Sequence, residues 1–183
     1  VFSRDELQVV ANLCQKWDVL AFSDEIYEHI LYDGEKHIAI ATLPGMEGRT
    51  VTINSLSKTY SVTGWRIGTI IASPELTGAI RKTHDFLTVG AAAPLQRAGA
   101  TALRLPDSYY AELAQSYTVK REMFLSILTS CGIPHYVPKG AYYVLANISK
   151  YGFDDDVAFT QFLIEKIGVA VVPGSSFFSK PEL

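Results

Sequence analysis

Lysine, arginine, glycine and hydroxyl side chains gather in one polar stretch between two apolar runs of the sequence. The stretch contains Ser55, Ser57 and Lys58, and it ends with Gly64 and Arg66. Hydroxyl groups and an arginine fork bind phosphate oxygens well, and a lysine amine can serve as a nucleophile. These residue types therefore predict a site that holds an anionic phosphate next to a reactive amine.

The apolar runs on either side supply the elements that would position these residues. Val51 to Ile53 is β-branched and apolar, which predicts a short buried strand, and Ile67 to Ala72 predicts another. Polar loops on a rigid scaffold are frequent sites of chemistry. We therefore expect residues 55–66 to form a functional loop between two buried strands.

A second polar segment lies nearer the amino terminus, directly after another apolar run. Val19 to Phe22 is short, continuous and apolar, which predicts a strand buried on both faces. The chain becomes polar at Ser23 and Asp24, so Asp24 is expected at the carboxyl end of that strand. In open α/β sheets, this end of the strands is where ligands bind.

Both polar segments resemble parts of one enzyme family. Ser55-Leu-Ser-Lys58 with Gly64-Trp-Arg66-Ile-Gly68 resembles the cofactor-lysine segment of the class I/II aminotransferases, which use pyridoxal 5'-phosphate (PLP). Ser23-Asp24-Glu25-Ile26-Tyr27-Glu28 resembles the strand end that binds the pyridine ring in the same family. The order of the two segments, and the spacing of 34 residues from Asp24 to Lys58, also fit the family.

The resemblance implies a role for three residues that would contact the ring and the substrate. Lys58 would form the Schiff base with the aldehyde of PLP and act as general base for the α-proton of the substrate. Asp24 would keep the pyridine nitrogen protonated, because a carboxylate partner favours the charged form. Tyr27 would donate a hydrogen bond to the oxygen on the ring.

The phosphate of PLP would be bound by Arg66 and Ser55. The planar fork of arginine suits bidentate contacts with phosphate, and Ser57 is a weaker candidate. Each residue also has a structural alternative when it is considered without its neighbours. The lysine would then be a solvated loop residue, Asp24 a turn or capping residue, and Tyr27 a buried core residue.

The alternation of apolar runs and helical patterns predicts an α/β fold. The resemblance implies part of the large-domain sheet of the PLP-transferases in residues 1–105, the second half of that PLP-binding domain. A smaller α+β carboxyl-terminal domain would follow in residues 106–183. Periodicity and capping residues predict helices at about 4–16, 73–86, 94–105, 106–131 and 154–167. Further apolar runs predict strands at 136–137, 141–146 and 169–172.

Composition limits the kinds of function. Hydrophobic residues make up 48% of the 183 residues and charged residues 19%, which predicts a packed core. A net charge of -3 gives no electrostatic basis for binding nucleic acid, and no apolar run reaches the ~18 residues of a membrane span. Cys14 and Cys131 lie far apart, which predicts free buried thiols in a reducing, cytoplasmic setting. The four histidines form no local ligand motif, so no metal site is expected.

The resemblance implies a PLP-dependent aminotransferase that transfers an amino group between an amino acid and a 2-oxo acid, and it implies a homodimer. Two alternatives stay open at this point. One is a PLP-dependent lyase or decarboxylase of the same fold, and the other is the aminotransferase-like effector domain of a transcription regulator. Because the family enzymes are about twice as long as a chain of this length, we expect a carboxyl-side fragment that is inactive alone.

Overall fold

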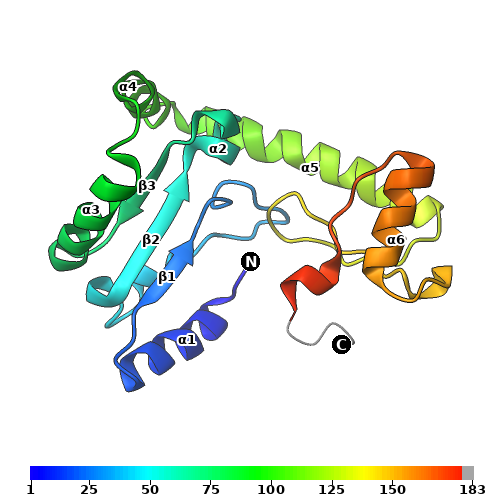
Figure 1. Cartoon of the computed structure of the whole chain (residues 1–183), viewed down its shortest axis with the longest axis horizontal. Coiled ribbons are helices and arrows are strands. Elements are labelled where there is room, and N and C mark those ends of the chain that lie inside the picture. Colours follow the sequence, from blue (N-terminus) through cyan, green and yellow to red (C-terminus); the bar gives the residue numbers. More distant parts are fainter. Residues whose placement is uncertain (179–183) are drawn as a thin grey trace. The chain divides into compact units, whose positions relative to one another are not determined.

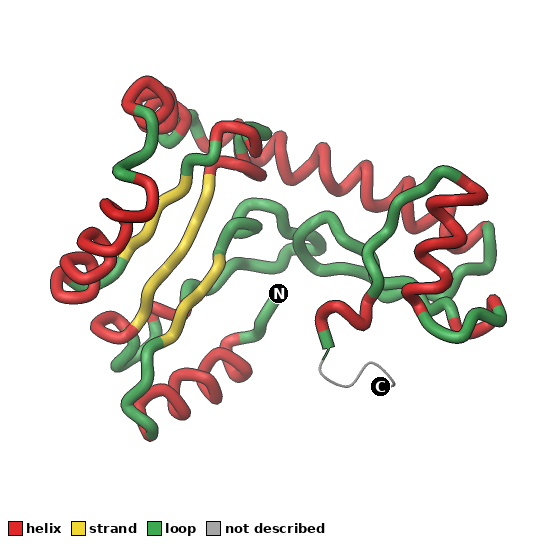
Figure 2. Tube along the Cα trace, viewed as in Figure 1, coloured by secondary structure: helices red, strands yellow, loops and turns green. Residues whose placement is uncertain are grey.

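A three-stranded sheet organises the amino-terminal part of the protein, for which a computed structural model describes residues 1–178. β1 (Ala21–Asp24) runs parallel to β2 (Thr50–Ser55), and β2 pairs antiparallel with β3 (Gly68–Ile71). Figure 1 labels the strands, and Figure 2 shows them in yellow. Because β3 runs back along β2, the ends of β1 and β2 and the start of β3 lie at the same end of the sheet.

The chain divides into two compact units. The first unit contains Val1–Thr118 together with Lys139–Ala141. The second contains Val119–Pro138 and the described residues from Tyr142 onward. The assignment of residues 1–105 and 106–183 to two domains of the family stays a prediction.

Helix α1 (Arg4–Lys16) forms where the sequence predicts it, because its first turn is capped from both sides. Ser3 Oγ accepts a hydrogen bond from the backbone N–H of Glu6, and the Glu6 carboxylate accepts one from the N–H of Ser3. The buried face of α1 packs on residues that follow β1 in the sequence. This core consists of Leu7, Ala11, Cys14, Ile40, Leu43 and Met46.

The strands themselves are less buried than the sequence predicts. The expected strand at 19–22 forms two residues later, as β1, and its side chains alternate between exposed and half-buried. Phe22 is 68% exposed, so the prediction of burial on both faces is wrong. The prediction of a buried strand is also wrong for β3, because every residue of β3 is exposed. Successive side chains of a strand point to opposite faces, and the described residues leave such apolar side chains uncovered.

The helices after the sheet begin close to the residues that the sequence predicts. Ser73 Oγ accepts from the N–H of Leu76 at the start of α3 (Pro74–Thr88). α4 (Ala93–Ala102) has Pro94 in its first turn, and it ends about one turn before the predicted end at residue 105. α5 (Asp107–Ser130) is the longest helix of the described residues, as predicted.

The buried face of α5 differs from the predicted apolar stripe. Phe124 is 47% exposed, whereas Arg121 is only 8% exposed. The Arg121 guanidinium donates to the Pro138 carbonyl and to the Glu122 carboxylate. A buried charge needs such partners, and these partners allow Arg121 to replace an apolar residue on the buried face.

Helix α6 (Asp156–Phe162) opens the last helical segment of the second unit, and a π-helical turn, η5 (Leu163–Ile167), extends it. This segment confirms the predicted helix, which ends at Gly168 in a left-handed conformation. The predicted strands at 136–137, 141–146 and 169–172 are wrong, because a strand needs a hydrogen-bonded neighbour along its length. The structure instead has single bridges, between His135 and Ala146 in this unit and between Leu31 and Gly140 in the first.

Two smaller expectations have mixed outcomes. No helix among residues 1–178 is both long and apolar enough to cross a bilayer. Cys14 is buried and Cys131 is exposed, and both are free thiols, so the prediction of burial is correct for Cys14 only.

Hydrogen bonds between Asp156 and Ser175 in the second unit lead to a prediction on pH dependence. The Asp156 carboxylate accepts hydrogen bonds from the backbone N–H and from the hydroxyl of Ser175, which follows in η6 (Gly174–Phe177). These bonds lower the pKa of Asp156 below its usual value of 3.8. The pKa of the Asp156 carboxyl is lower in the folded chain than in the unfolded chain. The hydrogen bonds from Ser175 therefore stabilise the fold at pH values above the usual pKa, and this stabilisation is lost as the pH falls through the lowered pKa.

Ser175→Ala, which removes the hydroxyl bond, should therefore lower the unfolding midpoint in denaturant near neutral pH. The difference from the unsubstituted chain should shrink as the pH falls below 3.8 and Asp156 becomes protonated. Ser176→Ala, at the exposed neighbouring position, is the matched control and should change little. An equal difference in the unfolding midpoint at neutral pH and at acid pH would contradict this account.

Candidate active site

The predicted site residues come together at one end of the sheet. Asp24 is the last residue of β1 and pairs in register with Ile53 of β2. Ser55 is the last residue of β2 and pairs with Gly68, the first residue of β3. The short helix α2 (Leu56–Thr59), which carries Lys58, follows β2 directly, as Figure 1 shows at the tip of that strand.

Ser55 and Ser57 form the hydrogen-bonded start of α2. Ser55 Oγ accepts from the N–H of Ser57 at 3.0 Å, as an N-cap residue does. The two hydroxyl oxygens lie 2.6 Å apart, and Ser55 Oγ also donates to the Ile67 carbonyl at 3.1 Å. Ser55 therefore fixes the first turn of the helix that carries the lysine, and it ties this turn to the residue before β3.

Arg66 lies in a strained turn next to the same serines. It follows η3 (Thr63–Trp65) and adopts a left-handed conformation with φ of 56°, which is uncommon for a residue with a side chain. Its Nη1 donates to the Thr63 carbonyl at 3.1 Å, and Thr63 Oγ1 donates to the Ser57 carbonyl at 3.0 Å. Thr63 thus shapes the loop, and the exposed Arg66 guanidinium keeps further donors for a ligand. Strain of this kind, about 1–3 kcal/mol, is concentrated at functional sites.

Asp24 and Tyr27 border a cavity of about 440 Å³. The Asp24 carboxylate is exposed and accepts from the N–H of Ile26 at 3.3 Å, which folds the chain into a turn after β1. Tyr27, half-buried in this turn, also lines the cavity. The described residues that line it do not include Lys58 or Arg66, so the cavity contains only the ring-binding part of the predicted site.

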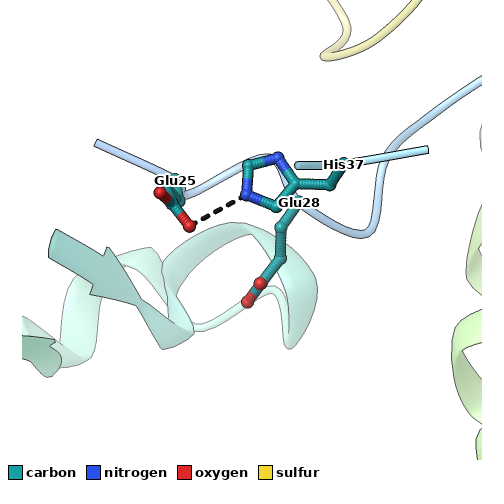
Figure 3. A group of neighbouring side chains, drawn as sticks. All are labelled: Glu25, Glu28 and His37. Carbon is teal, nitrogen blue, oxygen red and sulfur yellow. Dashed lines mark hydrogen bonds and ion pairs between the residues drawn. The ribbon is translucent and has the colours of Figure 1, made fainter. Parts of the chain in front are cut away.

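Figure 3 shows a neighbouring group that the sequence analysis did not find, formed by Glu25, Glu28 and His37. Glu25 is 5% exposed, and its carboxylate lies 2.8 Å from Nε2 of His37 and accepts from Ser23 Oγ at 2.9 Å. One potential ligand atom from each of the three residues lies within 4.8 Å of the others.

The hydrogen bonds of this group indicate a structural role. The Glu28 carboxylate accepts from the side chain of Asn54 on β2, and Glu25 is already paired with His37 and Ser23. These bonds hold the turn after Asp24 against β2 and the following loop. Twelve residues separate Glu25 from His37, so no local ligand spacing in the sequence could have identified the pair.

A carboxylate, an amine, a guanidinium and two hydroxyls therefore lie at one end of a sheet, on the segments that the family resemblance indicated. The sequence matches the family model of the class I and II aminotransferases over residues 1–183. The chain belongs to this aminotransferase family. Aminotransferases of this family are PLP-dependent.

Curated relatives and solved structures agree with the family match. The chain is 35% identical to kynurenine–oxoglutarate transaminase 1 of Mus musculus over 99% of its own length and 47% of the relative. It is 37% identical to kynurenine–oxoglutarate transaminase 3 of Rattus norvegicus, covering 97% of the chain and 42% of the relative. The structure of N-succinyldiaminopimelate aminotransferase from Mycobacterium tuberculosis is similar with a TM-score of 0.93 and 34% identity, over 98% of this chain and 47% of that one.

The chain spans about half the length of the curated relatives that it matches. The comparisons confirm the predicted family and the α/β fold class. The roles given to Asp24, Tyr27, Ser55, Ser57, Lys58 and Arg66 stay predictions.

The close approach of β2 and β3 at this end of the sheet leads to a second prediction. A Cβ atom on Gly68 would lie 2.7 Å from the backbone oxygen of Asn54, which is too close for any side chain. Gly68→Ala should therefore push β3 away from β2 and lower the free energy of unfolding by about 1–3 kcal/mol.

Gly78→Ala in α3 is the matched control, because a Cβ atom there meets nothing within 4 Å. This control should be neutral or stabilising by up to about 1 kcal/mol, since alanine favours a helix over glycine. Chemical unfolding followed by circular dichroism measures both variants. Equal stabilities of the two variants would contradict the close packing at Gly68.

Proposed function

We propose that the whole protein is a PLP-dependent aminotransferase that moves an amino group between an amino acid and a 2-oxo acid. The observation that carries the proposal is the meeting of three chain segments at one end of the sheet. Asp24 ends β1, Lys58 follows β2 in α2, and Arg66 precedes β3. In a member of the aminotransferase family, this donor set has the chemistry that PLP requires.

The residues fit the parts of PLP one by one. The arginine fork of Arg66 and the hydroxyls of Ser55 and Ser57 suit the phosphate, which accepts several hydrogen bonds. The Asp24 carboxylate suits the ring nitrogen, because it favours the protonated form. Tyr27, in the turn after Asp24, donates to the oxygen on the ring.

When bound, PLP supplies an electron sink for the electrons of the substrate α-carbon. The chain supplies the positions of the protons. Lys58 Nζ would hold the cofactor through its aldehyde, and the amine, when free, would take the proton from the substrate α-carbon. Asp24 would hold the proton on the ring nitrogen, and the phosphate contacts would keep the ring in place.

Family membership supports further proposals about the whole protein. We propose a homodimer, and we propose that residues 1–105 and 106–183 belong to the large and small domains of the family. The free thiols of Cys14 and Cys131 favour a cytoplasmic location, because disulfides are rare there. The relatives named as kynurenine–oxoglutarate transaminases make kynurenine and 2-oxoglutarate the first substrate pair to test.

The experiment that tests the function uses the complete protein loaded with PLP. An amino acid should convert the bound cofactor to its amine form, and a 2-oxo acid should convert it back, which absorbance spectra follow. Borohydride reduction before adding substrate, followed by peptide mapping, should place the cofactor on Lys58. Lys58→Ala should abolish this label and the exchange.

Two outcomes would reject this assignment. Steady release of ammonia from one amino acid, with no 2-oxo acid present, would favour a PLP-dependent lyase. A label on Lys82 or Lys139 in place of Lys58 would show that the lysine is wrongly identified. The first outcome concerns the reaction, and the second concerns the residue.

Asp24 and Arg66 should have separable roles in the same protein. Asp24→Asn should keep the cofactor bound but slow the removal of the α-proton, because the ring nitrogen loses its charged partner. Arg66→Ala should mainly weaken cofactor binding, by about 1.5–3 kcal/mol for the loss of a charged hydrogen bond.

Equilibrium dialysis of PLP measures binding, and single-turnover absorbance measures proton removal. Arg81→Ala, on exposed α3, is a matched control for the loss of an arginine charge and should affect neither quantity. Unchanged proton removal in Asp24→Asn would show that Asp24 does not face the ring nitrogen.

A further inference from the structure

A cluster of rings in the first unit contacts the helix that carries Lys58. It consists of Tyr60, Tyr109, Tyr110 and His29, and we call it the tyrosine clasp. The rings of Tyr60 and Tyr109 stack with centroids 5.7 Å apart, and Tyr110 meets Tyr109 edge to face at 5.5 Å. The ring of His29 lies 4.3 Å from that of Tyr110. Sequence analysis gave none of the four a functional role.

Tyr109 holds the end of α2 through the backbone. Its hydroxyl donates to the Thr59 carbonyl at 2.8 Å, and Thr59 is the residue after Lys58. The other carbonyls of this four-residue helix also have donors: Thr63 Oγ1 for Ser57, and the N–H of Ser61 for Lys58. A helix this short has no stability of its own. Its orientation is therefore set by contacts such as that with Tyr109.

Tyr110 joins the two segments on which the proposed function rests. Its hydroxyl lies 2.8 Å from that of Tyr60, which caps the carboxyl end of α2. Its ring contacts His29, two residues beyond Tyr27 in the turn that follows Asp24. One side chain from the start of α5 thus contacts both the lysine segment and the ring-binding segment.

The environment of Tyr60 and Tyr109 keeps these two hydroxyls protonated. Burial raises the pKa of Tyr60 well above its usual value of 10.0, and the hydrogen bond with Tyr110 adds to this. Burial likewise raises the pKa of Tyr109. Both side chains therefore keep their O–H hydrogens over the whole neutral range.

We infer that Tyr109 and Tyr110 are positioning residues for Lys58. Tyr109 sets the orientation of the lysine helix, and Tyr110 sets the distance of that helix from the segment with Asp24 and Tyr27. The inference rests on the proposed function and extends it to two residues on a third element, α5. Neither tyrosine is assigned a contact with cofactor or substrate.

Two cofactor probes separate positioning of the lysine from binding of the cofactor. PLP can attach to Lys58, whereas 4-deoxypyridoxine 5'-phosphate has a methyl group in place of the aldehyde and can only bind. In the complete protein, Tyr109→Phe and Tyr110→Phe remove one hydroxyl each and keep the ring. Each should weaken PLP binding about three- to tenfold, as for one lost hydrogen bond. The affinity for the analogue should change less than about twofold.

Hydrogen exchange without any cofactor gives a second readout. The N–H groups of Tyr60 and Ser61 bond to carbonyls within α2, so they report on this helix directly. They should exchange about three- to tenfold faster in Tyr109→Phe, while the amides of α1 keep their rates. Tyr136→Phe is the matched control, because this tyrosine is 67% exposed in the second unit. It should leave binding and exchange unchanged.

Each alternative result has one meaning. Equal losses for PLP and the analogue, or faster exchange throughout the chain, would overturn the inference and leave the tyrosines a general structural role. Unchanged PLP binding in both variants would also overturn it. If PLP fails to attach to Lys58 in the unsubstituted protein, the proposed function itself fails, and the positioning role fails with it.

Discussion

Backbone pairing between Ser55 and Gly68 is the constraint on which the site depends. This pair closes the antiparallel contact of β2 with β3 at the end where β1 also finishes. Only a residue without a Cβ atom fits opposite the Asn54 carbonyl, so Gly68 lets the two strands meet there. Without this pairing, the loop with Arg66 and the helix with Lys58 would keep only local bonds, such as those from Ser55 and Thr63, as a link. The candidate site therefore depends on main-chain pairing as well as on its side chains.

Features that depend on nearby residues could be predicted from the sequence. The first residues of α1 and α3 could be predicted, because a capping serine stands three residues before the backbone N–H that it accepts from. The change from apolar to polar residues correctly predicts Asp24 at the end of its strand. These signals are local, because a cap or a strand end involves only a few neighbouring residues. The common site of Asp24, Lys58 and Arg66 was implied by the family resemblance, because the order of strands and loops alone does not fix which strands pair.

Features that depend on distant partners could not be predicted. His37 pairs with Glu25 from the following loop, and the buried Arg121 donates to the Pro138 carbonyl, 17 residues further along the chain. Apolar runs in the second unit predicted strands, yet β propensity describes a fit to a neighbouring strand more than a property of the residue. The run at 169–172 lies among the described residues without such pairing. Phe22 shows the same limit, since the sequence cannot tell whether another element covers an apolar side chain.

The dependence of α2 on Tyr109 also has a consequence for the order of folding. Fifty residues separate Tyr109 from Thr59, so the contact forms only after a long loop has closed. The four-residue helix that carries Lys58 therefore gains this contact only when the start of α5 packs against it. The orientation that we propose for the Lys58 amine is thus a property of the folded first unit and not of residues 56–59 alone.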